Sequence, residues 1–234
     1  VTEASGPKVT GDIYVGAMNK YLFRGNDFSG KKWVLQGGVD LYYGNWTFGY
    51  WTNYQGKTAS GYERGVNEND IFIDYTYAPN DLISLNVGNS LYATTAATTN
   101  ELYLKAKLNT LLNPALAAYW DWHKSTKAGL FYTASISHSV EVRKEQLAIN
   151  VGALASYNQR NNNAAINANS ADGYDGAYSG FHNYELSISA DYTPTSYLTI
   201  TPSYVFSDAL SDKARDIAGI ESQHNFGIKA TFAF

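Results

Sequence analysis

Residues 33–54 read WVLQGGVDLYYGNWTFGYWTNY, and this stretch decides the fold because its hydrophobicity alternates with a period of two. Such alternation predicts β-strands, in which successive side chains point to opposite faces. Gly44 and Asn45 interrupt the pattern at its centre, and two turn-forming residues between alternating runs predict a tight hairpin. The stretch therefore predicts two antiparallel strands, Trp33–Tyr43 and Trp46–Tyr54.

The same alternation extends along the whole chain and predicts twelve strands in a single domain covering residues 1–234. The first of them places Val9, Ile13, Val15, Ala17, Tyr21 and Phe23 on one apolar face. The predicted strands are Val9–Arg24, Trp33–Tyr43, Trp46–Tyr54, Ile71–Ala78, Leu82–Leu91, Leu102–Leu108, Leu116–Trp122, Leu130–Val142, Leu147–Tyr157, Tyr184–Tyr192, Leu198–Phe206 and Phe226–Phe234.

The connections between these strands alternate between tight turns and long loops. The long connections are Gly56–Asp70, Asn158–His182 and Asp208–Ser222. Bacterial outer-membrane barrels have short periplasmic turns, longer extracellular loops and an even number of antiparallel strands. The fold predicted is therefore all-β, a transmembrane antiparallel up-and-down β-barrel of 12 strands. A soluble β-sandwich also alternates with period two, but the predicted strands are longer than the usual length of about 5 to 6 residues.

The composition excludes several other classes of protein. No run approaches the roughly 18 to 20 apolar residues that a spanning helix needs. Cys is absent, which excludes thiol catalysis and thiolate metal sites, and the net charge of −4 argues against nucleic acid as a partner. Aromatic residues make up 15% and charged residues only 16% of the chain, which favours a surface that faces lipid.

Strand parity separates a lipid-facing set of side chains from a set that faces the barrel lumen. Closure satisfies every backbone hydrogen bond in hydrocarbon, so the outward face must be apolar while the inward face can carry charge. Six acidic and five basic side chains fall on the inward parity, and this mixture predicts weak ion selectivity, unless the charges only pair across and fill the lumen. The predicted pore-lining residues are Asp12, Lys20, Arg24, Asp40, Asp74, Lys105, Lys107, Asp121, Glu185, Asp191 and Lys229.

The first 50 residues resemble those of the TorF-family porins of bacterial outer membranes. The residues that carry this resemblance are Tyr21, Phe23-Arg24-Gly25, Gln36-Gly37-Gly38 and Asp40-Leu41. The final Phe234 resembles the C-terminal residue of outer-membrane proteins generally, which the barrel-assembly machinery reads as a signal. The resemblance implies an outer-membrane barrel with pore activity, and it brings no catalytic residues.

Candidate catalytic and metal-binding residues do not form convincing sites. His138 and Ser139 are adjacent on a strand and point to opposite faces, so they cannot act as a base and nucleophile pair. Asp121 and His123 share a parity without a third ligand, and the acidic, glycine-containing segment 172–176 lacks the ligand spacing of a Ca²⁺ loop. We expect no enzyme activity, no cofactor and no metal site.

These inferences predict a monomeric outer-membrane porin through which small solutes or ions diffuse passively. The loop Asn158–His182 is expected to cover the outer mouth or fold into it. Because residues 1–8 are short and polar, we expect an export signal to have been removed. The alternative is a non-conducting barrel that serves a structural role or docks a partner through its extracellular loops.

Overall fold

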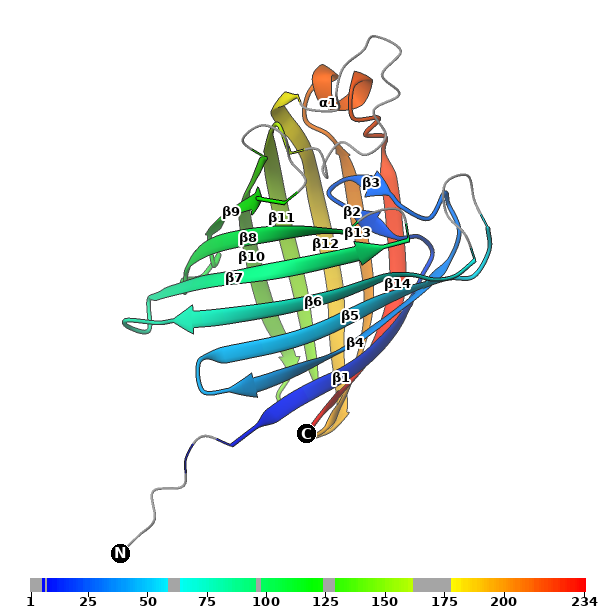
Figure 1. The fold of residues 1–234 in the computed structure, drawn as a ribbon. Helices are drawn as coiled ribbons and strands as arrows, with labels where there is room; N and C mark the ends of the chain where they lie inside the picture. The colour runs from blue at the N-terminus through cyan, green and yellow to red at the C-terminus, as the bar shows by residue number, and fades with distance from the viewer. Residues whose placement is uncertain (1–5, 7, 59–63, 96–97, 124–128, 162–177) are drawn as a thin grey trace, which may run out of the picture.

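A computed structural model describes residue 6 and residues 8–58, 64–95, 98–123, 129–161 and 178–234. Twelve long strands form one closed antiparallel barrel, which confirms the predicted fold class (Figure 1). They are β1 (Thr10–Met18), β4 (Val34–Tyr43), β5 (Trp46–Gln55), β6 (Gly65–Tyr77), β7 (Ile83–Thr94), β8 (Thr98–Leu108), β9 (Ala115–Asp121), β10 (Leu130–Arg143), β11 (Leu147–Gln159), β12 (Ser179–Thr195), β13 (Leu198–Ala209) and β14 (Gln223–Ala233).

The barrel closes because β1 pairs with β4 on one side and with β14 on the other. Gly11 and Phe234 exchange two backbone hydrogen bonds, of 2.9 and 2.8 Å, at the start of this seam. Closure leaves no long strand with an open edge, which is the condition for burying a sheet in hydrocarbon.

The outer wall of the barrel is apolar along the parity that the sequence predicts. Ile13 is 54% exposed, Leu116 65% and Leu186 51%, although each lies within a strand of the barrel. Soluble proteins rarely expose a continuous apolar surface of this kind, and a lipid-facing barrel requires one.

The short turns and the long connections lie at opposite ends of the barrel. The C-terminus and the start of β1 are at one end, and α1 (Asp212–Asp216) is at the other (Figure 1). At the first short turn Gly44 adopts a φ of +59°, which confirms the hairpin predicted from Gly44 and Asn45.

The connection between β13 and β14 contains a short helix where the sequence predicts a loop. Ser211 caps α1, since its hydroxyl accepts a hydrogen bond from the Ala214 backbone N–H at 3.1 Å. Ala214, Ala218 and Ile220 form a small buried cluster with Tyr178. In the described part of the chain, no helix has the length and hydrophobicity needed to cross a membrane.

The predicted first strand, Val9–Arg24, is too long. β1 ends at Met18, and the chain then forms a small hairpin of β2 (Leu22–Phe23) and β3 (Asn26–Asp27) before β4 begins at Val34. Tyr21 was predicted to face outward with Phe23, but it is only 8% exposed and packs against the inward-facing Trp51. The alternation continues through Tyr21 and Phe23 by coincidence, because the backbone has already left the barrel wall.

Candidate functional site

Residues 19–33, which we call the lumen hairpin, cross the barrel lumen at its long-loop end. The segment starts between β1 and β4, where the ring of Tyr21 lies 5.4 Å from the ring of Trp51 on β5. It reaches β12, the third strand from β1 around the barrel, where a Cβ atom on Gly25 would lie 2.9 Å from the Cβ atom of Asn183. Gly25 has a φ of +78°, so both its backbone conformation and the close approach favour glycine.

The carboxylate of Asp27 stabilises the second half of the lumen hairpin, which leads back toward β4. Asp27 Oδ1 accepts hydrogen bonds from the backbone N–H and the hydroxyl of Ser29, at 2.9 and 2.8 Å, and Oδ2 accepts from the backbone N–H of Lys31 at 2.7 Å. Asp commonly fixes a turn in this way, by replacing backbone acceptors with its own oxygens.

Arg24 anchors the tip of the lumen hairpin to the far wall. Its guanidinium makes two hydrogen bonds to Glu101 on β8, of 2.8 and 2.7 Å, and its Cζ lies 4.3 Å from the ring centroid of Phe131 on β10. The side chains of Arg24 and Glu101 are 8% and 0% exposed. Removing one partner of a desolvated pair of this type costs far more free energy than removing one partner of an exposed pair.

A histidine on β12 binds the backbone of the same tip. His182 Nε2 is 2.9 Å from the Arg24 carbonyl oxygen, and its Nδ1 contacts the Tyr178 hydroxyl. Because the carbonyl can only accept, Nε2 carries the proton and Nδ1 accepts from Tyr178. The carbonyl and the guanidinium of Arg24 are therefore both held by the barrel wall.

The two halves of the lumen differ in how open they are. Inward-facing polar residues near the long-loop ends of the strands are fully buried: Asn53, Gln55, Glu101, Asn158, His182, Asn183 and Ser207 are each 0% exposed. Inward-facing Ser137, Ser139 and Ser187, which lie nearer the short turns, are exposed. Within the described residues, the lumen is therefore filled at the long-loop end of the barrel and open at the short-turn end.

The structure places three of the predicted pore-lining residues on one cavity of about 370 Å³. Asp12 and Asp40 are direct cross-strand partners on β1 and β4, and Lys229 on β14 completes the group. Asp12 accepts a hydrogen bond of 2.9 Å from the Tyr42 hydroxyl. The cavity lies below the lumen hairpin and has side chains of opposite charge in its lining.

Lys20 and Arg24 lie on the lumen hairpin rather than on the predicted first strand. Lys20 Nζ donates a hydrogen bond of 2.7 Å to Gln223 on β14. Both side chains remain inside the ring of strands, but as part of the structure that fills it.

The other six predicted residues project inward from four strands, β6, β8, β9 and β12. Asp74 accepts from the Tyr103 hydroxyl at 3.0 Å, and Lys105 Nζ lies 4.3 Å from the Tyr103 ring centroid. Asp191 accepts from Asn150 and Thr201, Glu185 from Asn183, and Asp121 from Thr99, while Lys107 is exposed. These residues line one lumen without converging on a single site.

Sequence reasoning missed three inward-facing acids, Glu68, Asp70 and Glu101. The predicted loop Gly56–Asp70 is wrong for its last residues, because β6 begins at Gly65. The strand predicted to begin at Leu102 is too short, because β8 begins four residues earlier, at Thr98. Extending the period-two pattern backward from Ile71 and Leu102 would have placed Asp70 and Glu101 on the inward parity.

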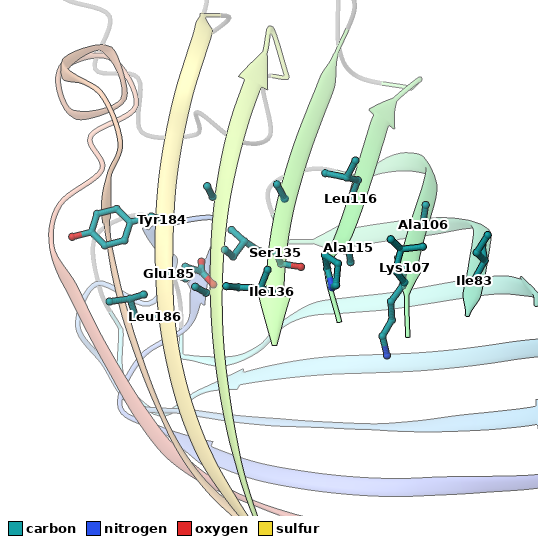
Figure 2. A pocket seen from close by; sticks show the side chains of 16 residues that line it. Ile83, Ala106, Lys107, Ala115, Leu116, Ser135, Ile136, Tyr184, Glu185 and Leu186 are labelled. Atoms are coloured by element: carbon teal, nitrogen blue, oxygen red, sulfur yellow. The ribbon is translucent and has the colours of Figure 1, made fainter. Parts of the chain in front are cut away.

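A hollow of about 640 Å³ lies on the apolar outer wall, across β8 to β12 (Figure 2). Small outward residues such as Ala106, Ala134 and Ala155 form its floor, and Leu116 and Leu186 border it. Lys107 and Glu185, whose side chains project inward, also belong to its lining, while its apolar part lies on the surface that the fold presents to lipid.

The loop Asn158–His182, which was predicted to cover the outer mouth, lies largely outside the described residues, as does the acidic segment 172–176.

His138 and Ser139 were predicted not to form a catalytic pair. His138 Nδ1 lies 2.8 Å from the Leu111 carbonyl oxygen. Its neighbour Ser139 faces the lumen, so the two side chains are on opposite sides of the wall.

No protein-family model and no curated protein matches the chain. Solved porin structures share its architecture at low identity. The NanC porin aligns over 94% of this chain and 98% of its own, with 13% identity and a TM-score of 0.61. The KdgM porin aligns over 95% and 99%, with 12% identity and a TM-score of 0.58, and has also been solved in complex with disordered oligogalacturonate. The COG4313 outer membrane channel from Pseudomonas putida F1 aligns over all of both chains, with 11% identity and a TM-score of 0.51. The chain therefore has a porin-like barrel fold.

Proposed function

We propose that this chain spans a bacterial outer membrane and forms a narrow pore for the passive diffusion of small solutes and ions. The observation that carries the proposal is a closed, apolar-coated barrel whose polar interior has a cavity on each side of the lumen hairpin. The cavity below the hairpin measures about 370 Å³. A second, of about 310 Å³, lies above it between Gly30, Lys31 and Glu221. The hairpin is then the constriction of the pore.

The lining favours cations over anions. With Glu68, Asp70 and Glu101 included, nine acidic side chains project into the lumen against the five bases predicted from the sequence. Arg24 neutralises only Glu101 among them by a direct ion pair within the described residues. Excess charge of one sign in a pore lowers the barrier for ions of the other sign. An acidic oligosaccharide such as oligogalacturonate fits this lining less well than a small cation or a neutral solute.

The resemblance to TorF-family porins agrees with this proposal, and we propose that the chain is related to that family. Tyr21 and Phe23-Arg24-Gly25, which carry much of the resemblance, build the lumen hairpin. Assembly through Phe234 is also consistent with the fold, because this residue is 59% exposed on the outer wall at the closing seam. We propose that the barrel-assembly machinery binds it there.

The second candidate function is a non-conducting barrel that docks a partner through its long loops. The fully buried polar layer around the lumen hairpin favours this alternative, because it fills the long-loop end of the barrel.

Recording from planar bilayers distinguishes the two functions. A pore gives discrete conductance steps, and in a KCl gradient its reversal potential has the sign of cation preference. A barrel that never conducts in any salt, yet loses a binding partner when its loops are removed, supports the docking role instead.

A further inference from the structure

Two carboxylates that have no cationic partner among the described residues lie at the constriction. Glu68 and Asp70 are two positions apart on β6, both face the lumen, and each is only 8% exposed. A β-bulge in β6 opposite Asn53 and Tyr54 turns Asn67 inward beside Glu68, so three oxygen-bearing side chains project from consecutive inward positions.

The lumen hairpin covers this pair of acids. The cross-strand neighbours of Asp70 are Trp51 on β5 and Tyr92 on β7. Tyr21 of the hairpin packs on Trp51 at 5.4 Å between ring centroids, and Phe23 packs on Tyr92 at 6.1 Å. The Tyr21 side chain also lies beside Glu68. The two carboxylates therefore lie directly under the constriction.

Asp70 is incompletely satisfied. Its Oδ1 atom is buried and has no hydrogen-bond partner in the described part of the protein. None of the ion pairs between described residues includes Glu68 or Asp70. Glu101, at a similar depth on β8, shows the contrast, since Arg24 binds both of its oxygens.

Buried carboxylates that lack a partner are costly to keep charged, and proteins relieve the cost with a bound cation or a proton. The donors gathered here are carboxylate, amide and phenol oxygens, which hard cations prefer. Two carboxylates match a double positive charge, and an irregular set of oxygens suits Ca²⁺ better than Mg²⁺, which demands near-ideal octahedral geometry.

We propose that Glu68 and Asp70, with the Tyr21 hydroxyl and Asn67 beside them, form a binding site for a divalent cation of the Ca²⁺ type at the constriction of the barrel. Its place on a permeation path rests on the proposed function, but cation binding by the folded barrel does not. Such a cation would bridge β6 to the lumen hairpin through Tyr21.

The site is tested by equilibrium binding to the full chain, folded in detergent and freed of metal with a chelator. The probe is Tb³⁺, whose emission is excited through nearby Tyr and Trp side chains, with Ca²⁺ as the competitor at mildly alkaline pH. We expect saturable emission that Ca²⁺ displaces. Asp70→Asn and Glu68→Gln should each weaken Ca²⁺ binding by about ten-fold or more, the usual scale for losing part of a metal site.

Asp191→Asn is the matched control, because Asp191 also faces the lumen but already accepts hydrogen bonds from Asn150 and Thr201. It should bind Ca²⁺ as the unchanged protein does. Heat-modifiable gel migration verifies that each variant is folded. Absence of saturable binding to the folded wild type, or equal binding by wild type and both site variants, overturns the proposal.

Bilayer recording separates this result from the proposed function. Binding without conductance keeps the cation site and rejects the pore, whereas conductance without binding keeps the pore and rejects the site. If both hold, added Ca²⁺ should reduce the monovalent current of the wild type more than that of Asp70→Asn; an equal reduction places the bound cation away from this pair and contradicts the proposal.

Discussion

Arg24 and Glu101, 77 positions apart in the sequence, form a bidentate ion pair across the barrel lumen. The pair joins the tip of the lumen hairpin to β8, on the wall opposite the point where the hairpin begins. Arg24 Cζ lies 4.3 Å from the ring centroid of Phe131 and 5.1 Å from that of Tyr119. The lumen hairpin is therefore fixed at both ends across the lumen.

Removing the ion pair between Arg24 and Glu101 should loosen the lumen hairpin. Arg24→Ala leaves Glu101 buried without its partner, which costs about 3–5 kcal/mol in comparable buried pairs. We expect larger or more frequent conductance steps in planar bilayers. Lys144→Ala is the control, because Lys144 and Glu145 are 83% and 82% exposed and form only a 3.8 Å pair. Steps of unchanged size in Arg24→Ala would show that the hairpin is not held by this pair.

The charges in the cavity below the hairpin should set ion preference in opposite directions. Asp40→Asn removes a negative charge and Lys229→Gln a positive one from the same cavity. In a KCl gradient the reversal potential should shift toward anion preference for Asp40→Asn and toward cation preference for Lys229→Gln. Shifts of the same sign, or none, would place the ion path elsewhere.

The lipid-facing parity can be tested with adjacent residues of β12. Ile188 is 49% exposed on the outer wall, whereas Ser187 is exposed toward the lumen. Ile188→Lys should lower the free energy of unfolding from lipid vesicles by about 2–4 kcal/mol if the residue lies near the bilayer midplane. Ser187→Lys should change it little. Equal effects of the two substitutions would contradict the assignment of faces.

Gly88 makes room for Tyr103 inside the barrel. A Cβ atom at Gly88 would lie 2.4 Å from the Tyr103 hydroxyl oxygen and 2.6 Å from the Ile73 carbonyl oxygen. Gly88→Ala should displace Tyr103 from its hydrogen bond to Asp74 and destabilise the barrel by about 1–3 kcal/mol. The temperature of the heat-modifiable gel shift measures this loss, with Ser84→Ala on the same strand as the control. An unshifted temperature in Gly88→Ala would mean that Tyr103 adjusts freely.

The barrel wall could be predicted from the sequence because one physical rule, inward or outward parity, governs every strand. Leu186 and Ile188 are apolar while Ser187 and Ser189 are polar, and the structure assigns them to the expected faces. Gly44 and Asn45 likewise encode a turn locally. These signals depend only on neighbours in the sequence.

The constriction could not be predicted in the same way, because it depends on contacts between distant residues. Nothing near Arg24 in the sequence indicates that Glu101 or His182 will hold it. The turn residues Gly25, Asn26, Asp27 and Gly30 follow the predicted end of the first strand at Arg24, so they do not indicate that β1 ends at Met18. The apolar alternation through Tyr21 and Phe23 extended the predicted strand beyond Met18, since lumen aromatics and lipid-facing aromatics look alike in sequence.

The central claim is that the lumen hairpin constricts an otherwise open pore, and replacing the hairpin tests it most directly. Met18 and Val34 are cross-strand partners, so an Asn-Gly turn can connect β1 to β4 in place of residues 19–33. Single-channel recording in planar bilayers should give small steps for the wild type and steps several-fold larger for the replacement. Equal steps in the two proteins, or silence in both, would contradict the account.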